Sequence, residues 1–344
     1  MRHRAVLCGC GAMAKGWLKA LTESDFLREK VEVVGLVDLD QATAQALAAE
    51  FKLHDIIIGT DLPTVLRQSK ADLLFDVVVP AARRAVVAAG LAHGCHVLSE
   101  KPMAATLDEA RELRRLAADA SRVHAIVQNR RFIDGVRRIR RLIQSGSLGE
   151  LTALHCDFFL GPHFGGFREQ MDNVLLLDMA IHTFDAARFM SGKDPLAVYC
   201  HEYNPQGSWY RHGAAANAIF EFSDNVAFTY RGSWCAQGAN TSWESTWRIT
   251  GSKGTLLWDG GELFEANVVT GREGFLRAVE PIVVPEAEDR ADTNGHASVI
   301  ERFISAVDAG TVPETDGSDN IKSLAMVFGA IDSARNGKRV TIAA

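Results

Sequence analysis

Residues 4–14 read RAVLCGCGAMA, and this stretch decides the fold of the first half of the chain. A short apolar run leads directly into the pattern GxGxxA, which marks the turn from a first strand into a helix in dinucleotide-binding proteins. Gly9 permits the tight turn, Gly11 lets the backbone approach a pyrophosphate, and Ala14 allows close helix–strand packing. Phosphates are favoured at a helix N-terminus, so we predict that a dinucleotide is bound here. The residues expected to contact it are Gly9, Gly11, Ala12 and Met13.

Apolar runs and helical patterns alternate from this turn up to residue 127. The candidate strands are 4–9, 31–37, 56–58, 73–79, 95–99 and 123–127, and the candidate helices are 12–24, 41–50, 62–68, 81–93 and 106–120. Runs such as VEVVGLV (31–37) are continuously apolar, which is typical of parallel strands buried on both faces. The alternation predicts βαβ units with right-handed crossovers. We therefore expect a Rossmann domain, a doubly wound parallel sheet, over residues 1–127.

Asp38 ends the second candidate strand and bears on the choice of cofactor. A carboxylate in this place can accept a hydrogen bond from a ribose 2′-hydroxyl, and it repels a 2′-phosphate. The residues that follow, Leu39 and Asp40, offer no cation to hold such a phosphate. The sequence therefore favours NAD over NADP, although Asp38 lies 27 residues after Gly11, beyond the usual spacing of about 20.

The second half of the chain has a different pattern. A strongly apolar helix is expected at about 173–191, and strand-like segments follow from 195 to 270. In NVAFTYR (225–231), large apolar residues alternate with small or polar ones, which indicates a sheet with one buried face. Short turns between the segments predict antiparallel pairing. We expect an α+β domain over 128–344, with a large, mostly antiparallel sheet.

Composition excludes several classes of partner. The formal net charge is −6, whereas nucleic-acid-binding proteins usually carry a basic excess. The longest apolar runs are too short to cross a membrane, and the apolar N-terminal stretch is better explained as a strand than as a signal peptide, so we expect a cytoplasmic protein. The six cysteines form no CxxC pair and no cluster with zinc spacing, which indicates buried thiols and no metal site.

Two segments carry candidate catalytic side chains. Lys101 follows the fifth strand in Ser99-Glu100-Lys101-Pro102, at the edge of the sheet where ligands of parallel folds bind. Asp178 and His182 lie four residues apart in the apolar helix and so share one face. Alternative explanations are a solvated loop lysine, a structural Asp–His pair, or a metal-binding pair that lacks a third ligand.

Several motifs resemble the Gfo/Idh/MocA family, the glucose–fructose oxidoreductase and inositol dehydrogenase group. They occur in the family's order: GCGAMA at 9–14, CHVLSEKPMA at 95–104, QNRRF at 128–132, SGSLGE at 145–150 and LLDMAIHTFD at 176–185. The resemblance implies a Rossmann domain, an α+β domain whose sheet forms a dimer or tetramer face, NAD(P), and hydride transfer at a sugar or polyol hydroxyl.

The resemblance also implies roles for individual residues. It assigns Lys101, Asp178 and His182 to catalysis, and it places Arg130 near the substrate. Glu100, Lys101 and Pro80 are expected beside the cofactor, and His163 and Arg168 are candidates for lining the substrate pocket. The residue types suit the reaction, because a histidine can exchange the hydroxyl proton near neutral pH and a lysine can stabilise charge on the oxygen. Which of Lys101 and His182 accepts the proton stays open.

Two departures from the family pattern concern the substrate and the fourth strand. The segment 171–175 reads MDNVL where relatives are glycine-rich, and 79–84 reads VPAARR where relatives often carry a histidine after the proline.

Two rival functions stay open beside a sugar or polyol dehydrogenase. One is a non-catalytic NAD-binding sensor, and the other is an NAD-using glycosidase without net redox. We expect a homodimer or homotetramer with a small-molecule substrate.

Overall fold

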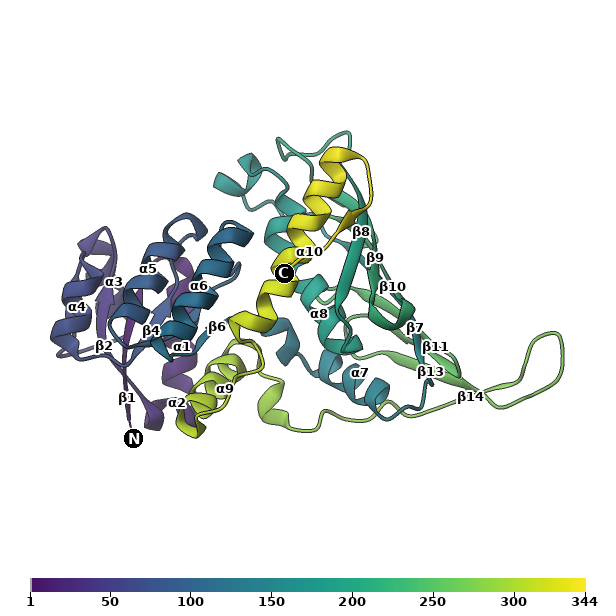
Figure 1. The fold of residues 1–344 in the computed structure, drawn as a ribbon, viewed down its shortest axis with the longest axis horizontal. Coiled ribbons are helices and arrows are strands. Elements are labelled where there is room, and N and C mark those ends of the chain that lie inside the picture. Colours follow the sequence, from purple (N-terminus) through teal and green to yellow (C-terminus); the bar gives the residue numbers. More distant parts are fainter. Residues whose placement is uncertain (1) are drawn as a thin grey trace. The chain divides into compact units, whose positions relative to one another are not determined.

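A computed structural model describes residues 2–344, with the backbone alone described for Arg290 (Figure 1). The chain forms two compact units. The first contains the residues up to Asn129 together with Asn294–Ile321. The second contains Arg130–Thr293 and Lys322–Ala344.

The first unit is built on a six-stranded parallel sheet of order β3-β2-β1-β4-β5-β6. Its strands are β1 (His3–Cys8), β2 (Val31–Val37), β3 (Ile57–Gly59), β4 (Leu73–Asp76), β5 (His96–Ser99) and β6 (His124–Ile126). Its helices are α1 (Ala12–Glu23), α2 (Asp25–Lys30), α3 (Gln41–Glu50), α4 (Leu62–Ser69), α5 (Pro80–Ala92), α6 (Leu107–Ala120) and α9 (Gly295–Ala309). The strand order reverses between β1 and β4, as in a doubly wound fold, so the predicted Rossmann sheet is confirmed.

Helix α2 was not predicted from the sequence. It lies between the first candidate helix (12–24) and the second candidate strand (31–37), where the sequence analysis expects no element. Ser24 begins it, and the Ser24 hydroxyl accepts a hydrogen bond from the backbone N–H of Leu27. A six-residue helix is too short to show a clear period, so only its N-cap residue marked it in the sequence.

Helix α9 also belongs to the first unit, and here the structure differs from the expected division at 127. The helix packs against α1 and α2. Ser24 donates a hydrogen bond of 2.6 Å to Glu301, and Lys30 pairs with Asp308 at 2.7 Å. The chain therefore leaves the first unit near Asn129 and returns to it at Asn294.

The second unit contains a nine-stranded sheet of order β14-β13-β12-β11-β7-β10-β9-β8-β15. Neighbouring strands are antiparallel except β7 and β10, which confirms the predicted, mostly antiparallel sheet. The strands are β7 (Leu151–Phe159), β8 (Pro195–Tyr203), β9 (Ala215–Phe222), β10 (Val226–Ser233), β11 (Thr246–Gly251), β12 (Gly254–Trp258), β13 (Phe264–Val269), β14 (Val279–Pro281) and β15 (Val340–Thr341).

Helical segments complete the second unit. They are η1 (Asn129–Phe132), α7 (Asp134–Gln144), η2 (Gly166–Gln170), η3 (Leu175–Ala180), α8 (Ile181–Ser191), η4 (Ser223–Asn225), η5 (Arg290–Asp292) and α10 (Gly317–Asn336), of which η1 and α10 extend across the division between the units. Phe184 of α8 contacts Phe220, Phe228 and Tyr230, whose rings lie 4.8–6.1 Å away. The apolar side chains of alternating strand residues therefore point toward α8, and this side of the sheet forms the core of the unit.

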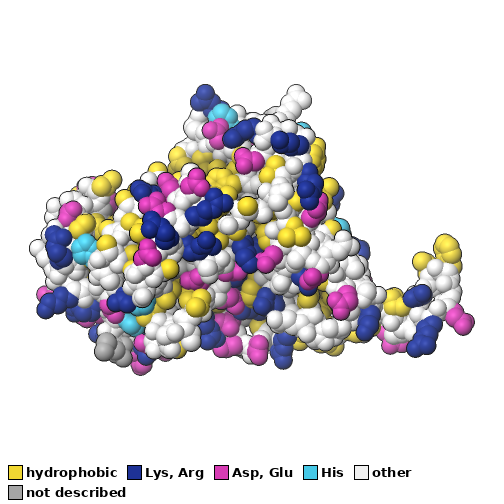
Figure 2. All heavy atoms as spheres, in the orientation of Figure 1, with side chains coloured by type: hydrophobic (Ala, Val, Ile, Leu, Met, Phe, Trp, Pro, Cys, Tyr) yellow, Lys and Arg dark blue, Asp and Glu magenta, His cyan; other side chains and the backbone are white. Residues whose placement is uncertain are grey.

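The two faces of the large sheet differ sharply in composition. Trp247 and Trp258 are buried with the core side chains, so they do not form an exposed aromatic face. The opposite face carries mostly polar residues, among them Thr229, Arg231 and Arg248. Beyond β13, the segment between β13 and β14 projects from the sheet edge as an arm, and Figure 2 shows hydrophobic side chains at its tip.

Candidate active site

The turn between β1 and α1 has the backbone that the GxGxxA pattern predicts. Gly9 has φ +95°, and a Cβ added there would lie 2.7 Å from the carbonyl carbon of Val77. Gly11 caps α1 with φ −72°, and a Cβ added there would meet nothing within 4 Å. Gly9 is therefore required by the protein itself. Because Gly11 faces open space, its lack of a side chain leaves room for a ligand at the helix N-terminus, and these residues fit a dinucleotide pyrophosphate.

Asp38 lies directly after β2 and is tied to this turn. One of its carboxylate oxygens accepts a 2.7 Å hydrogen bond from the backbone N–H of Cys10, and the other accepts one of 3.0 Å from Asp40. A carboxylate can accept about four hydrogen bonds, so Asp38 keeps capacity for ribose hydroxyls. The neighbouring Leu39 is almost fully exposed.

Glu100, predicted beside the cofactor, is a buried anchor for the loop after β5. Its Oε1 accepts hydrogen bonds from Trp17 at 2.9 Å and from His296 at 3.0 Å. Burial by itself would raise the pKa of Glu100, but the hydrogen bond and charge of His296, with Trp17, outweigh it and lower the pKa. Its Oε2 accepts the backbone N–H of Lys101 at 3.2 Å. Glu100 therefore positions the loop that carries Lys101.

A second support for this loop was missed in the sequence. Arg83 of α5 is buried and donates to Asp76 at the end of β4 at 2.8 Å, to the Val78 carbonyl at 2.6 Å, and to the carbonyl of Pro102. Burial raises the pKa of Asp76, and the guanidinium of Arg83 opposes this effect. Through Arg83, the VPAARR segment (79–84) thus supports the loop that carries Lys101. Pro80 starts the helix that carries Arg83.

In the second unit, Asp178 and His182 lie on consecutive helical segments. Asp178 is in the π-helical turn η3, and His182 is in the first turn of α8. Arg168 donates a 2.9 Å hydrogen bond to the Asp178 carboxylate, so a predicted substrate residue is paired with a predicted catalytic one. Part of the spacing between them is therefore π-helical, whereas the sequence analysis assumes a regular α-helix.

His182 lines a small hollow together with Arg130 and Trp243. Arg130 forms an ion pair with Glu244, and burial lowers the pKa of Arg130 to about 10, which leaves it charged at neutral pH. The structure therefore brings the predicted residues Arg130 and His182 together within the second unit. Glu244 and Trp243 come from the loop before β11, and the sequence did not indicate that Glu244 pairs with Arg130.

His163 takes part in a different contact. Its ring stacks on the ring of Trp209, with 3.8 Å between the ring centroids.

The buried ion pair of Arg131 and Asp185 has a structural role. Asp185 is fully buried, accepts two hydrogen bonds of 2.7 Å from Arg131, and also accepts one from Ser323.

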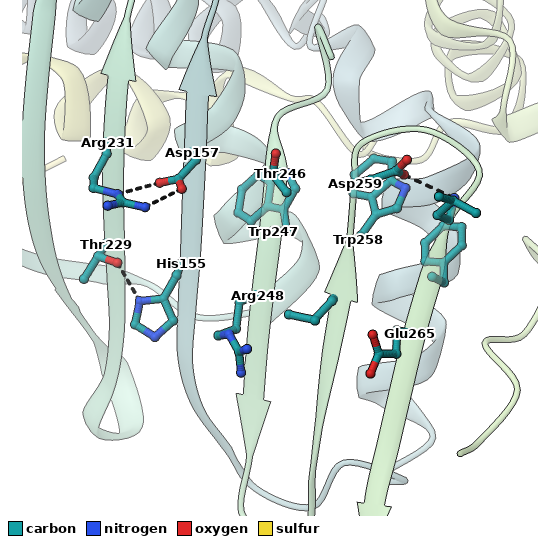
Figure 3. Close-up of a pocket in the computed structure, with 13 residues that line it drawn as sticks. His155, Asp157, Thr229, Arg231, Thr246, Trp247, Arg248, Trp258, Asp259 and Glu265 are labelled. Carbon is teal, nitrogen blue, oxygen red and sulfur yellow. Dashed lines mark hydrogen bonds and ion pairs between the residues drawn. The ribbon is translucent and has the colours of Figure 1, made fainter. Parts of the chain in front are cut away.

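A hollow much larger than the one at His182 lies elsewhere in the second unit, on the polar face of the large sheet (Figure 3). Its volume is about 700 Å³, and it contains none of the predicted site residues. Figure 3 shows His155 pointing to Thr229, and Arg231 paired with Asp157, on strands β7 and β10. Volume alone therefore does not identify the candidate catalytic site.

The described residues contain no group of three or more His, Cys, Asp or Glu side chains arranged to hold a metal ion. All six cysteines are free thiols, and five of them are buried as predicted, whereas Cys235 is partly exposed. No helix within the described part of the chain has the length and apolar character needed to span a membrane.

Comparison with known proteins decides the family. Residues 3–128 match the oxidoreductase family with an NAD-binding Rossmann fold, and residues 136–257 match the Gfo/Idh/MocA C-terminal domain. The chain belongs to the Gfo/Idh/MocA family. It is an NAD-binding oxidoreductase, and the predicted family and dehydrogenase class are confirmed.

Curated relatives and solved structures of this Gfo/Idh/MocA protein extend over its whole length. An inositol 2-dehydrogenase of Rhizobium meliloti is 24% identical and covers 100% of both chains. A D-apiose dehydrogenase of Paraburkholderia graminis is 23% identical over 99% of this chain and 90% of its own. A crystal structure of an oxidoreductase from Agrobacterium radiobacter, in complex with NAD+, L-tartaric acid and magnesium, has a TM-score of 0.85 at 18% identity, covering 99% and 98% of the two chains.

Proposed function

We propose that this protein is a dehydrogenase that transfers a hydride between NAD and a secondary hydroxyl of a sugar, an inositol or a related polyol. The observation that carries the proposal is the dinucleotide turn, with Gly11 open to a ligand, in a chain that also holds Lys101, Asp178 and His182. The names of the inositol and apiose dehydrogenase relatives support the substrate class.

Each catalytic side chain has a distinct role in this proposal. Lys101 donates a hydrogen bond to the reacting oxygen and stabilises the negative charge that develops on it. His182 exchanges the hydroxyl proton, and the carboxylate of Asp178, oriented by Arg168, holds the substrate. The nicotinamide, when bound, supplies or accepts the hydride.

NAD is the proposed cofactor because of Asp38 and Leu39. A 2′-phosphate would meet the carboxylate of Asp38, and the exposed Leu39 offers it no cation. The crystal structure of the Agrobacterium radiobacter protein contains NAD+, which is consistent with this choice.

Kinetics of Lys101→Ala and His182→Asn test the catalytic assignment. Each change should lower kcat/KM by about 10² to 10⁴, the usual contribution of a positioned acid–base group. NADH affinity should change only a few-fold, because neither side chain cradles the pyrophosphate. The double variant should be little worse than the weaker single variant, since groups that act together are non-additive. The best substrate from a panel of polyols, inositols and aldoses is used, with NADH titrated by fluorescence.

Two exposed residues provide matched controls. Lys19 on α1 and His201 on the polar sheet face are replaced in the same way, and Lys19→Ala and His201→Asn should retain full activity. Near-normal turnover in Lys101→Ala or His182→Asn would remove that residue from the site. Loss of NADH binding in parallel with activity would instead assign it a structural role.

The same panel separates the rival functions. A dehydrogenase produces NADH in proportion to the oxidised substrate, whereas an NAD-using glycosidase cleaves its substrate without net NADH. A sensor binds NADH and turns nothing over. Either of the last two results would replace the proposed function.

A further inference from the structure

Three aromatic side chains near the candidate catalytic segment of the second unit are exposed to solvent. Phe164 is 47% exposed, Phe167 68% and Trp243 45%. The neighbouring Trp234, by contrast, is 2% exposed. Large apolar groups that remain exposed together commonly mark a binding surface.

A buried tryptophan supports two of these rings. The ring centroid of Trp234 lies 5.7 Å from that of Phe164 and 5.7 Å from that of Trp243, and the Trp243 ring stands at 89° to it. The ring centroids of Phe164 and Trp243 lie 6.5 Å apart. Aromatic pairs at these separations attract one another, so Trp234 fixes the two exposed rings in place. We call Phe164 and Trp243 the aromatic platform.

The aromatic platform is connected to both candidate catalytic residues of its unit. The guanidinium of Arg168 lies 5.0 Å from the centre of the Phe164 ring while it donates to Asp178. Trp243 and His182 line the same small hollow. The aromatic platform therefore adjoins Asp178 through Arg168 and shares a hollow with His182, so a substrate that reaches these residues also reaches the platform.

We infer that the aromatic platform binds a second ring or an apolar aglycone, so that the substrate is a glycoside rather than a free monosaccharide or inositol. The inference rests on the proposed function. Sugar rings have an apolar face of C–H groups that stacks on aromatic side chains, and an aryl aglycone stacks in the same way. Binding energy from a remote part of a substrate can also be used at the reacting centre, which gives such an extension a catalytic purpose.

Substrate preference provides the first test. The kcat/KM of the wild-type protein is measured with D-glucose, methyl β-D-glucoside, 4-nitrophenyl β-D-glucoside and a panel of disaccharides. At least one two-ring compound should exceed its monosaccharide by tenfold or more. Trp243→Ala and Phe164→Ala should each reduce that ratio by about tenfold, the effect of an aromatic contact near 1.4 kcal/mol. Tyr199→Ala, which removes a ring of similar exposure on the polar sheet face, should leave the ratio unchanged.

Binding without turnover provides the second test. Saturation-transfer NMR of 4-nitrophenyl β-D-glucoside and of the disaccharide panel should show contact between the second ring and the protein, and Trp243→Ala should weaken it. Such binding without any turnover would refute the proposed function but support the inferred binding role of the aromatic platform. If monosaccharides are oxidised with no preference for the two-ring compounds, the platform is refuted and the dehydrogenase stands.

Two further outcomes would overturn the inference. Absence of both binding and turnover for every glycoside would do so. A change in oligomer mass in Trp243→Ala, with glycoside binding intact, would show that these rings contact another subunit instead.

Discussion

The carboxylate of Asp38 makes cofactor preference depend on one residue. It accepts hydrogen bonds from the backbone N–H groups of Cys10 and Asp40, and we propose that its remaining lone pairs accept from ribose hydroxyls. Asp38→Ser with Leu39→Arg should remove the repulsion of a 2′-phosphate and add a cation for it. The ratio of kcat/KM for NADP over NAD should then rise by at least tenfold, about the effect of one new charge-assisted hydrogen bond. A native preference for NADP would refute our interpretation of Asp38.

His124 on β6 should make the protein sensitive to acid. Burial, with the nearby charge of Arg83, lowers its pKa from 6.5 to about 3. The unfolded chain therefore binds a proton below about pH 6.5 that the folded protein does not, so the stability present above that pH is lost as pH falls from 6.5 toward 3. By pH 5 the loss should approach about 2 kcal/mol.

Denaturant unfolding at pH 7 and pH 5 measures this effect. His124→Gln should show a smaller fall in unfolding free energy between the two pH values than the wild-type protein. His201→Gln, on the exposed polar face, should behave like the wild type. An identical fall in wild type and His124→Gln would show that other groups dominate the acid sensitivity.

At this scale the sequence could indicate which residue types carry chemistry, but not their partners. Position and spacing made Lys101, Asp178 and His182 candidates, and the family resemblance assigned them to catalysis. The Arg168–Asp178 pair joins residues ten apart across an irregular loop, and Arg130–Glu244 joins residues 114 apart. Such pairs depend on tertiary packing, and no periodic pattern records them.

Among the secondary-structure elements, the β1–α1 turn separates two uses of glycine. A Cβ at Gly9 would clash with the backbone of Val77 at a positive φ, whereas one at Gly11 would clash with nothing. Gly9→Ala should therefore destabilise the fold and lower Tm by several degrees. Gly11→Ala should leave Tm nearly unchanged and weaken NADH binding by about tenfold or more, a cost of 1.4 kcal/mol or above.

Thermal melts with and without NADH, beside fluorescence titrations, distinguish the two glycines. Gly16→Ala serves as the control, because it adds the same methyl group to α1 away from the turn, where the added Cβ would meet nothing within 4 Å. Tight NADH binding by Gly11→Ala would show that the bound dinucleotide does not come close to the protein backbone at Gly11.

Helical spacing in the sequence correctly predicted one long apolar helix over about 173–191, and it missed the π turn within it. The structure divides this region into η3 and α8. A π turn inserts one residue into a helix whose apolar pattern is otherwise continuous, so residue periodicity does not reveal it. Such turns are frequent at functional sites, and Asp178 lies in this one.

For the whole molecule, we still predict a homodimer or homotetramer, but the structure changes the reason. Trp234, Trp247 and Trp258 are in the core, so they cannot supply an apolar contact surface, and the exposed Trp243 lies in a loop. The polar face instead combines the 700 Å³ hollow with ion pairs, and the arm beyond β13 exposes Phe275 and Leu276 completely or nearly so. Apolar side chains exposed to this degree favour contact with another surface.

Light scattering at micromolar concentration should give a multiple of the 37.5 kDa chain mass. Leu257→Glu in the hollow, or Phe275→Ser with Leu276→Ser on the arm, should shift the mass toward a monomer. Lys19→Glu, in the other unit, should not. A monomeric wild-type protein would refute the prediction.

The division of the chain shows where prediction from sequence ends at this scale. The first crossing, near 129, was close to the predicted boundary because strand–helix alternation stops there. The return at Asn294 was not predicted, since an amphipathic pattern shows that α9 has a buried face but not which sheet or helices cover it.

That return has a consequence for how the protein is made. A ribosome synthesises all of Arg130–Thr293 before α9 emerges. The first unit of the nascent chain therefore remains incomplete while the large sheet is synthesised. During that interval α1 and α2 lack their covering helix, and Glu100 lacks His296 beneath the loop of Lys101. A gene fragment that stops near Asn129 should therefore yield a poorly folded product. A chimera that exchanges the first unit between relatives must contain both of its segments, the residues up to Asn129 and Asn294–Ile321. The N-terminal segment alone would not suffice.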